Sequence, residues 1–158
     1  MEIDANKVKI IQYNPVSNLP SETNALIEYL TKVWNDGDAL YPDIIVNANS
    51  IKYKCHRLLL GSFSNYFKNI LETTDDILEI CFNMEDGKSV GAIFKNILEF
   101  FYTGNIMITQ DNIKDIYNVS VYLDIKLLRR ECEKILGHWF KETYSDNQYF
   151  DPILSDIF

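Results

Sequence analysis

A switch in hydrophobic period over one short stretch is the feature that most constrains this fold. From Asp43 to Asn47 the chain is apolar and rich in β-branched residues, and residues 47–50 are turn material. Ile51 to Cys55 then alternates between apolar residues and the basic Lys52 and Lys54, as one strand of a half-buried pair does. From residue 58 the apolar residues become adjacent instead of alternating. The stretch therefore predicts a β-hairpin that leads directly into a helix.

The helix after the hairpin is predicted to be short and buried, weakened and ended by Gly61 and Ser62. Its apolar residues are Leu58, Leu59, Leu60 and Phe63. Ser64 is the predicted N-cap of a second helix, because a serine hydroxyl can accept one of the backbone N–H groups left free at a helix start. That second helix is marked by Tyr66, Phe67, Ile70 and Leu71.

This succession resembles the beginning of a BTB/POZ domain: a strand with a leading Asp, a hairpin, His-Arg, an apolar helix and Ser-x-x-Phe. Residues 94–104 (Phe-Lys-Asn-Ile-Leu-Glu-Phe-Phe-Tyr-Thr-Gly) resemble the family's amphipathic helix that ends in Tyr-Thr-Gly. Residues 108–113 and 122–125 resemble the start and the close of its next helix, and residues 128–136 resemble its last helix. The four motifs occur in the family's order, and the resemblance covers residues 23–140.

The resemblance implies an α+β fold, with a small central sheet of about three main strands flanked by helices. It also implies an N-terminal strand and helix that serve dimerisation. We assign residues 1–20 to the N-terminal strand and linker and residues 21–144 to the BTB/POZ domain. Residues 145–158 are a tail, or the start of a further helical region; their apolar face either packs back on the domain or begins another module.

Composition excludes several classes of function. The net charge is −8, and we find no cluster of Lys and Arg, so we predict neither nucleic-acid binding nor docking on an anionic membrane. The N-terminus lacks the pattern of a signal peptide, and no apolar run approaches membrane-spanning length. We therefore predict a cytoplasmic or nuclear protein. The three cysteines, Cys55, Cys81 and Cys132, are interpreted as buried apolar residues of a reduced protein.

No constellation of residues predicts an enzyme, a metal site or a cofactor. The cysteines and the two histidines, His56 and His138, lack the short paired spacings of a zinc site. No nucleotide-binding glycine motif and no nucleophile motif occurs. We interpret His56 as a structural residue whose ring bonds a backbone group.

The N-terminal segment contains a strand over residues 7–13, a linker over residues 15–20 with two prolines, and a helix from about residue 21 to 34. The helix carries one wide apolar stripe: Leu26, Tyr29, Leu30, Val33 and Trp34. Two interpretations stay open, core of the same subunit or subunit interface. The resemblance implies that this helix lies at a homodimer interface. It also implies that Val8 and Ile10 lie in a strand that pairs beside Ile106 and Ile108 of the partner subunit.

The second half of the chain predicts four further elements before a final long helix. They are a strand over 77–82, a helix over 90–101 capped by Ser89 and stopped by Gly104, a strand over 105–108 and a helix over 112–123 capped by Thr109 or Asp111. The predicted inner face of the helix over 112–123 consists of Ile113, Ile116, Tyr117, Ser120 and Val121. The final helix spans about 126–144, with Leu128, Cys132, Ile135 and Trp139 on one stripe.

Asp43 and Arg57 have two interpretations. Related domains in zinc-finger repressors keep a charged pair of this kind near the dimer groove, where corepressor segments dock. The simpler interpretation is a strand-start carboxylate held by backbone N–H groups, together with an exposed arginine.

Two functions of different class follow from the resemblance: an adaptor that recruits partners to a cullin-RING ubiquitin ligase, or a dimerisation module that binds corepressor or host-factor segments without a cullin. The cullin face implied by the resemblance includes Glu72, Asp75, Asp76, Tyr117, Tyr122 and Asp124. Cullin-binding members carry a longer loop with an apolar-x-Glu signature after the Ser-x-x-Phe helix. Here Ile77-Leu78-Glu79 is predicted to fall on a strand, so we expect cullin binding that is weak or that depends on residues outside 1–158.

Overall fold

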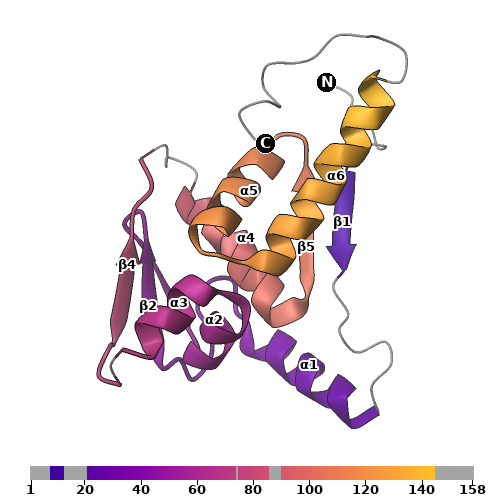
Figure 1. Ribbon diagram of the computed structural model, residues 1–158. Coiled ribbons are helices and arrows are strands. Elements are labelled where there is room, and N and C mark those ends of the chain that lie inside the picture. Colours follow the sequence, from indigo (N-terminus) through magenta and orange to yellow (C-terminus); the bar gives the residue numbers. More distant parts are fainter. Residues whose placement is uncertain (1–7, 13–20, 74, 86–89, 145–158) are drawn as a thin grey trace.

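The computed structural model describes residues 8–12, 21–73, 75–85 and 90–144, whose arrangement is shown in Figure 1. Its elements, in chain order, are β1 (Val8–Gln12), α1 (Ser21–Val33), β2 (Ile44–Ala48), β3 (Ile51–Cys55), α2 (Arg57–Phe63), α3 (Asn65–Leu71), β4 (Glu79–Phe82), α4 (Val90–Thr103), β5 (Asn105–Thr109), α5 (Ile113–Tyr122) and α6 (Lys126–Tyr144). No helix in these ranges is both long and apolar enough to cross a membrane.

The main sheet has three strands in the order β3-β2-β4. β2 and β3 form the predicted hairpin, and both turn residues, Asn49 (φ 47°) and Ser50 (φ 72°), adopt the positive φ of a two-residue hairpin turn. The Asn49 side chain also donates to the Met84 carbonyl at 3.1 Å and accepts from the Met84 N–H at 2.9 Å. The turn is thereby tied to the segment after β4, and the α+β fold with a small sheet is confirmed.

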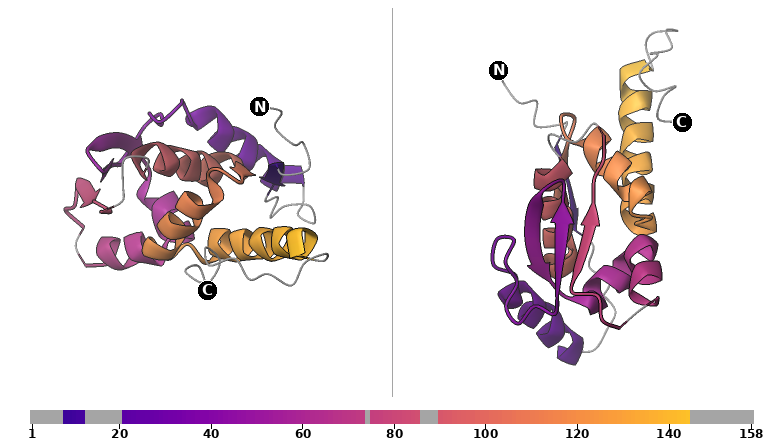
Figure 2. Two further views of the ribbon diagram at one scale, coloured as in Figure 1. Left: turned by 90° about the horizontal axis from the view of Figure 1, so that it is seen from above. Right: turned by 90° about the vertical axis from the view of Figure 1, so that its left-hand side faces the viewer.

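β4 runs parallel to β2 and lies on the opposite side of it from β3, so the connection from β3 to β4 passes over the end of β2. The crossover is made by the short helices α2 and α3. The right-hand view of Figure 2 shows the sheet from its outer face, with helices beside and behind it. Residues on the inner face of the three strands are buried, including Val46, Tyr53 and Phe82.

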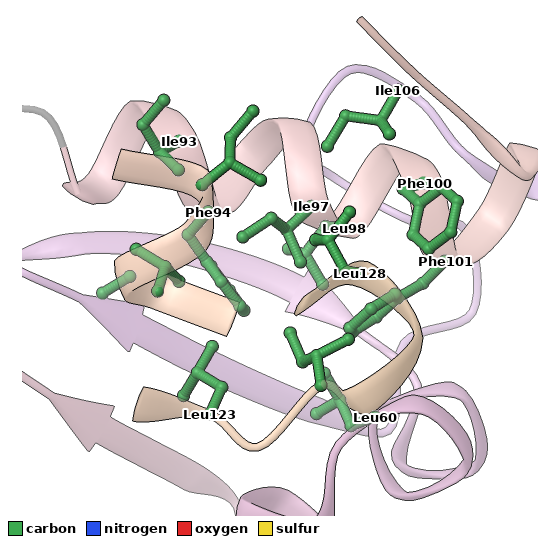
Figure 3. Packing of buried hydrophobic residues seen from close by; sticks show 14 of the residues in the cluster. Leu60, Ile93, Phe94, Ile97, Leu98, Phe100, Phe101, Ile106, Leu123 and Leu128 are labelled. Atoms are coloured by element: carbon green, nitrogen blue, oxygen red, sulfur yellow. The ribbon is translucent and has the colours of Figure 1, made fainter. Parts of the chain in front are cut away.

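Helix α4 lies between the sheet and the remaining helices (Figure 1) and is buried on nearly every side. Its Phe94, Ile97 and Leu98 are fully buried. In Figure 3 they lie against Leu60 of α2, Leu123 after α5 and Leu128 of α6. Gly104 ends the helix as predicted, with φ 74° and an N–H that donates to the Phe100 carbonyl at 2.8 Å.

A second sheet of two antiparallel strands pairs β1 with β5 of the same chain. In its register Val8 lies opposite Thr109 and Ile10 lies opposite Met107. On β5, Ile106 and Ile108 point into the core and Met107 is exposed.

Ser64 connects three segments of the fold. Its Oγ accepts from the Phe67 N–H at 3.1 Å, which confirms the predicted N-cap of α3. The same hydroxyl donates to the Leu123 carbonyl at 2.6 Å. Because Ser64 is 1% exposed, one buried hydroxyl both starts α3 and fixes it to the turn between α5 and α6.

The structure corrects the prediction for the first crossover helix. α2 continues through Gly61 and Ser62 to Phe63, and Leu58 is 79% exposed rather than buried. Successive residues in a helix are rotated by about 100°, so three adjacent leucines cannot all face one side. Leu59 and Leu60 face the core, and Leu58 faces solvent.

Four other predictions were wrong in detail. β4 begins at Glu79, so Ile77 and Leu78 precede the strand, and Leu78 is 74% exposed. On α5 Val119 is buried in place of the predicted Val121, which is 45% exposed. The N-cap position of α5 is Asn112 rather than the predicted Thr109 or Asp111, and the Asn112 side chain makes no capping hydrogen bond. Cys81 is exposed, unlike the other two cysteines.

The predicted stripe of α6 is confirmed, since Leu128, Cys132, Ile135 and Trp139 are all buried. Burial raises the pKa of the Cys132 and Cys55 thiols to about 12, so both are inert apolar residues at neutral pH. The predicted linker 15–20, the Ser89 cap and the apolar face of the tail lie outside the described residues.

Replacing Ser64 by alanine should lower the free energy of unfolding by about 2 kcal/mol, because it removes an N-cap and the shorter of the two hydrogen bonds to the buried Leu123 carbonyl, which keeps only the Tyr66 N–H at 3.4 Å. Urea denaturation followed by tryptophan fluorescence measures this change. Ser62→Ala is the matched control: its hydroxyl is exposed and bonds only within its own helix, to the Leu58 carbonyl. We expect a change within about 0.5 kcal/mol there. Equal effects of the two variants would contradict the assigned role of Ser64.

Candidate interaction surfaces

The apolar stripe of α1 is divided between the core and the surface. Val33 is buried and Leu30 is half-buried, while Leu26 and Tyr29 are each 56% exposed. Trp34 stacks on Tyr102 of α4 with ring centroids 5.1 Å apart. The C-terminal end of α1 is therefore anchored in the domain, and its middle presents two large apolar side chains to solvent.

Asp43 and Arg57 are joined through backbone atoms. The Asp43 carboxylate accepts from the Arg57 backbone N–H at 2.8 Å, at the start of α2. The Arg57 guanidinium donates to the Asp43 carbonyl at 3.4 Å and to the Ile77 carbonyl. The simpler interpretation of Asp43 is confirmed, because its carboxylate is held by a backbone N–H. Arg57, however, is half-buried and connects β2 to the segment before β4.

Beside this pair lies an open hollow of about 550 Å³. Asp43, Arg57 and Lys68 contribute charged groups, and Glu72 and Asp75 add two more carboxylates. The structure thus brings two of the predicted partner-binding residues to the predicted charge pair. The rest of the lining is Leu58, Gly61, Ser62 and Leu71. Sequence reasoning did not select these four residues, although three consecutive leucines at 58–60 already required one to face outward.

The other predicted partner-binding residues lie elsewhere. The Tyr117 hydroxyl is 3.5 Å from Glu133 of α6. Asp124 accepts from the Asn65 side chain at 2.9 Å, at the beginning of α3. Asp76 is exposed between the hollow and β4. The six predicted residues are therefore distributed over more than one patch.

Tyr122 belongs to an aromatic cluster near the end of β4. Its ring centroid lies 5.5 Å from that of Tyr66 and 5.9 Å from that of Phe82. The pKa of the Tyr66 phenol is raised above its ordinary value, mainly by burial and to a smaller extent by the nearby Tyr122. Because Tyr122 remains 42% exposed, this cluster offers an aromatic contact surface.

His56 is a structural residue, as predicted. Its Nε2 lies 2.7 Å from the Tyr41 carbonyl, which can only accept, so Nε2 carries the proton. Nδ1 then accepts from the Tyr102 hydroxyl at 2.8 Å. Within the described ranges no group of three or more His, Cys, Asp or Glu side chains is placed to hold a metal ion.

The family model of the BTB/POZ domain matches residues 33–138, which is more than half of the chain. The chain belongs to the BTB/POZ family. The fold agrees: the BTB domain of zebrafish PATZ1 superposes with a TM-score of 0.62 at 17% identity, covering 77% of this chain and 98% of that domain. The BTB domain of human Gigaxonin gives a TM-score of 0.58 at 19% identity, covering 78% and 97%.

Curated relatives of this BTB/POZ chain come from two groups of proteins. Kelch-like protein 24 of Homo sapiens is 24% identical over 145 residues, covering 84% of this chain and 23% of the relative. Kelch-like protein 28 of Mus musculus is 33% identical over 95 residues, covering 57% and 16%. Zinc finger and BTB domain-containing protein 7A of Gallus gallus is 26% identical over 122 residues, covering 74% and 21%.

The chain therefore spans less than a quarter of the length of these relatives. What they share with it is the BTB/POZ domain, a fold for protein–protein interaction. The chain is accordingly a protein-interaction module.

The outer face of the sheet carries one interaction with a measurable pH signature. Lys52 Nζ lies 3.0 Å from the Glu79 carboxylate, and the Asn47 amide lies 3.4 Å from it. The hydrogen bond from Lys52 lowers the pKa of Glu79 below its ordinary value. The stabilisation is present above the ordinary glutamate pKa and is lost as the pH falls through the lowered one.

An NMR titration of the Glu79 carboxyl should give a midpoint below that of an ordinary glutamate, and Lys52→Met should raise it. Lys54→Met is the matched control, because Lys54 is on the same strand and pairs with Asp38 at 3.3 Å instead. A Glu79 midpoint that responds equally to both variants would contradict the pairing.

Proposed function

We propose that this BTB/POZ domain is a homodimeric adaptor of the cytosol or nucleus that recruits partner proteins to a cullin-RING ubiquitin ligase. The family resemblance supports dimerisation and cullin binding as the domain's two activities. The observation that carries the proposal is the placement of exposed apolar side chains: Leu26 and Tyr29 on α1, and Leu78 in the loop before β4. These are the helix and the loop that the resemblance assigns to the dimer and to the cullin.

The proposed dimer interface is centred on α1. Burying a large apolar side chain contributes about 1.5–3 kcal/mol, so covering Leu26 and Tyr29 from both subunits is a strong driving force. The pairing edge of β5 is the second part of this interface. Its inner residues Ile106 and Ile108 are buried, so β1 contributes there through its backbone ladder. Exchange of β1, with Val8 and Ile10, between the subunits remains a prediction.

Light scattering should give a mass near twice the chain mass of 18.4 kDa. Leu26→Asp with Tyr29→Asp should give a folded monomer, because both side chains are largely exposed and their replacement removes no core packing. Val121→Asp on α5 is the matched control, since Val121 is 45% exposed on a different face, and it should remain a dimer. A monomeric wild type would reject this interface.

The proposed cullin surface follows the loop between α3 and β4. Because β4 begins at Glu79, Ile77 and Leu78 lie in this loop, and Leu78 supplies an exposed apolar group two positions from an exposed acid, Asp76. This supports more cullin affinity than the sequence alone indicated. Acidic residues speed encounter with a basic partner, while a desolvated apolar anchor dominates affinity.

Titration calorimetry against the N-terminal region of the cullin scaffold tests this surface. Leu78→Ala should weaken binding about tenfold to thirtyfold, as loss of an interface anchor worth about 1.4–2 kcal/mol does. Leu40→Ala is the control, because Leu40 is another exposed leucine (46%, against 74% for Leu78) and lies in the loop after α1. Absence of binding, or equal losses for the two variants, would reject the cullin role.

A second candidate function is the docking of a corepressor-like or host-factor segment without a cullin. It is favoured by the hollow beside Asp43 and Arg57, whose rim combines Leu58 with charges of both signs. A displayed peptide library distinguishes the two functions. Selected peptides that bind wild type but not Leu58→Asp, and that still bind Leu78→Asp, would favour docking in the hollow.

A further inference from the structure

Among the described residues no strand pairs with the outer edge of β4, and neither proposed function uses the backbone groups of this edge. β4 is the outermost strand of the sheet, and its other edge is bonded to β2: the Ile45 N–H donates to the Leu78 carbonyl and the Asn49 N–H to the Phe82 carbonyl, both at 3.0 Å. In a parallel ladder alternate residues point their backbone groups to the same side. Glu79 and Cys81 therefore point their N–H and C=O groups away from β2.

The two outer edges of the sheet differ. At β3 the loop after α1 covers the edge at Lys54, where Asp38 forms a bridge with Lys54 and the Ala39 N–H donates to the Lys54 carbonyl at 3.1 Å. At β4 the outward residues Glu79 and Cys81 are exposed. An edge of this kind is a template for one more strand.

The charge around β4 specifies what kind of strand it would accept. Residues 72–86 contain six acidic residues and no basic residue. Asp75 before the strand and Glu85 after it are both exposed, so acidic groups stand at both ends of the edge. On the outer face, Glu79, which pairs with Lys52 at 3.0 Å, adds a carboxylate next to the position of an added strand.

The inner side of the same edge is apolar. Gly91 of α4 lies against Ala48 and Ile51, so α4 covers the β2 and β3 part of the sheet. Tyr122 packs on Phe82 and remains 42% exposed, which places it on the β4 side. Every second side chain of an added strand would point to this aromatic surface, and the others would point toward Glu79.

We propose that the free edge of β4 binds an extended segment of a partner protein as a fourth strand, and that this segment alternates basic and apolar residues. The backbone of the segment pairs with Glu79 and Cys81. Its basic side chains lie on the outer face near Glu79, and its apolar side chains pack on Tyr122. This mode of recognition obtains affinity from main-chain hydrogen bonds and selectivity from alternate side chains.

The first test uses a fluorescein-labelled peptide, Lys-Ile-Lys-Val-Lys-Ile-Lys, and fluorescence anisotropy with the full chain. One matched peptide is N-methylated on the backbone amides of its lysines, and the other on the backbone amides of its isoleucines and valine. In a paired strand only one of these sets faces β4. We expect one methylated peptide to bind at least about tenfold more weakly and the other to bind like the parent. Equal binding of all three would mean that charge alone attracts the peptide and would overturn the proposal.

The second test changes the protein at the centre of the edge. Cys81→Pro removes an N–H that points to the free edge, where proline is tolerated, and should weaken the parent peptide about tenfold. Cys81→Ser keeps the N–H and should bind like wild type. Binding unaffected by Cys81→Pro would contradict the proposal. If that variant does not fold, the methylated peptides on the wild-type chain decide the question.

A second copy of the chain is the other occupant that the same measurements detect. Sedimentation would then show self-association of wild type beyond the dimer formed through α1. If Cys81→Ser retains this association, Cys81→Pro abolishes it and the peptide does not displace it, the edge pairs with another β4. That result would also overturn the proposal.

Discussion

The burial of α4 on nearly all sides is the constraint on which the rest of the domain depends. α4 keeps one solvent-facing stripe, with Ala92 and Glu99 exposed and Lys95 and Asn96 half-buried, and the rest of its surface is apolar. A helix with so wide an apolar surface is stable in water only if other elements cover that surface. The three-stranded sheet covers one side of α4 with Val46 and Tyr53, and α5 and β5 cover others. Leu128 of α6 packs beside them (Figure 3). The short helices α2 and α3 and the end of α1 close the remaining gaps. Most elements of the fold therefore pack directly on α4.

Burying a helix with polar groups on it requires partners for those groups. Tyr102 of α4 is 2% exposed, and burial raises the pKa of its phenol well above the ordinary value. Its hydroxyl is satisfied by His56, whose ring in turn bonds the Tyr41 carbonyl. Tyr53 donates to the Gly91 carbonyl at 2.6 Å in the same way. With Ser64, these contacts tie segments that are far apart in the chain, and they fix where the surfaces lie.

The surfaces available for partners are what this packing leaves exposed. Arg57 shows the connection, because its backbone N–H and guanidinium position the start of α2 against β2 and the loop before β4. That arrangement brings Asp43, Glu72 and Asp75 around one hollow. It also places Leu58 and Leu78 in solvent. The same parallel pairing that inserts β2 between its neighbours leaves β4 with an open edge.

The sequence by itself determined the local elements of this protein. Period two predicted the hairpin, helical spacing predicted α6 and its buried stripe, and capping chemistry predicted the roles of Ser64 and Gly104. These features depend on residues within a few positions of one another. The exposure of single residues could not be predicted in this way. Leu58 and Cys81 were predicted to be core residues, and only the packing of the domain places them in solvent. The gathering of Asp43 with Asp75, and the open edge of β4, were also decided by tertiary structure. The physical reason is that burial and proximity depend on which distant element covers a face, and no local pattern contains that information.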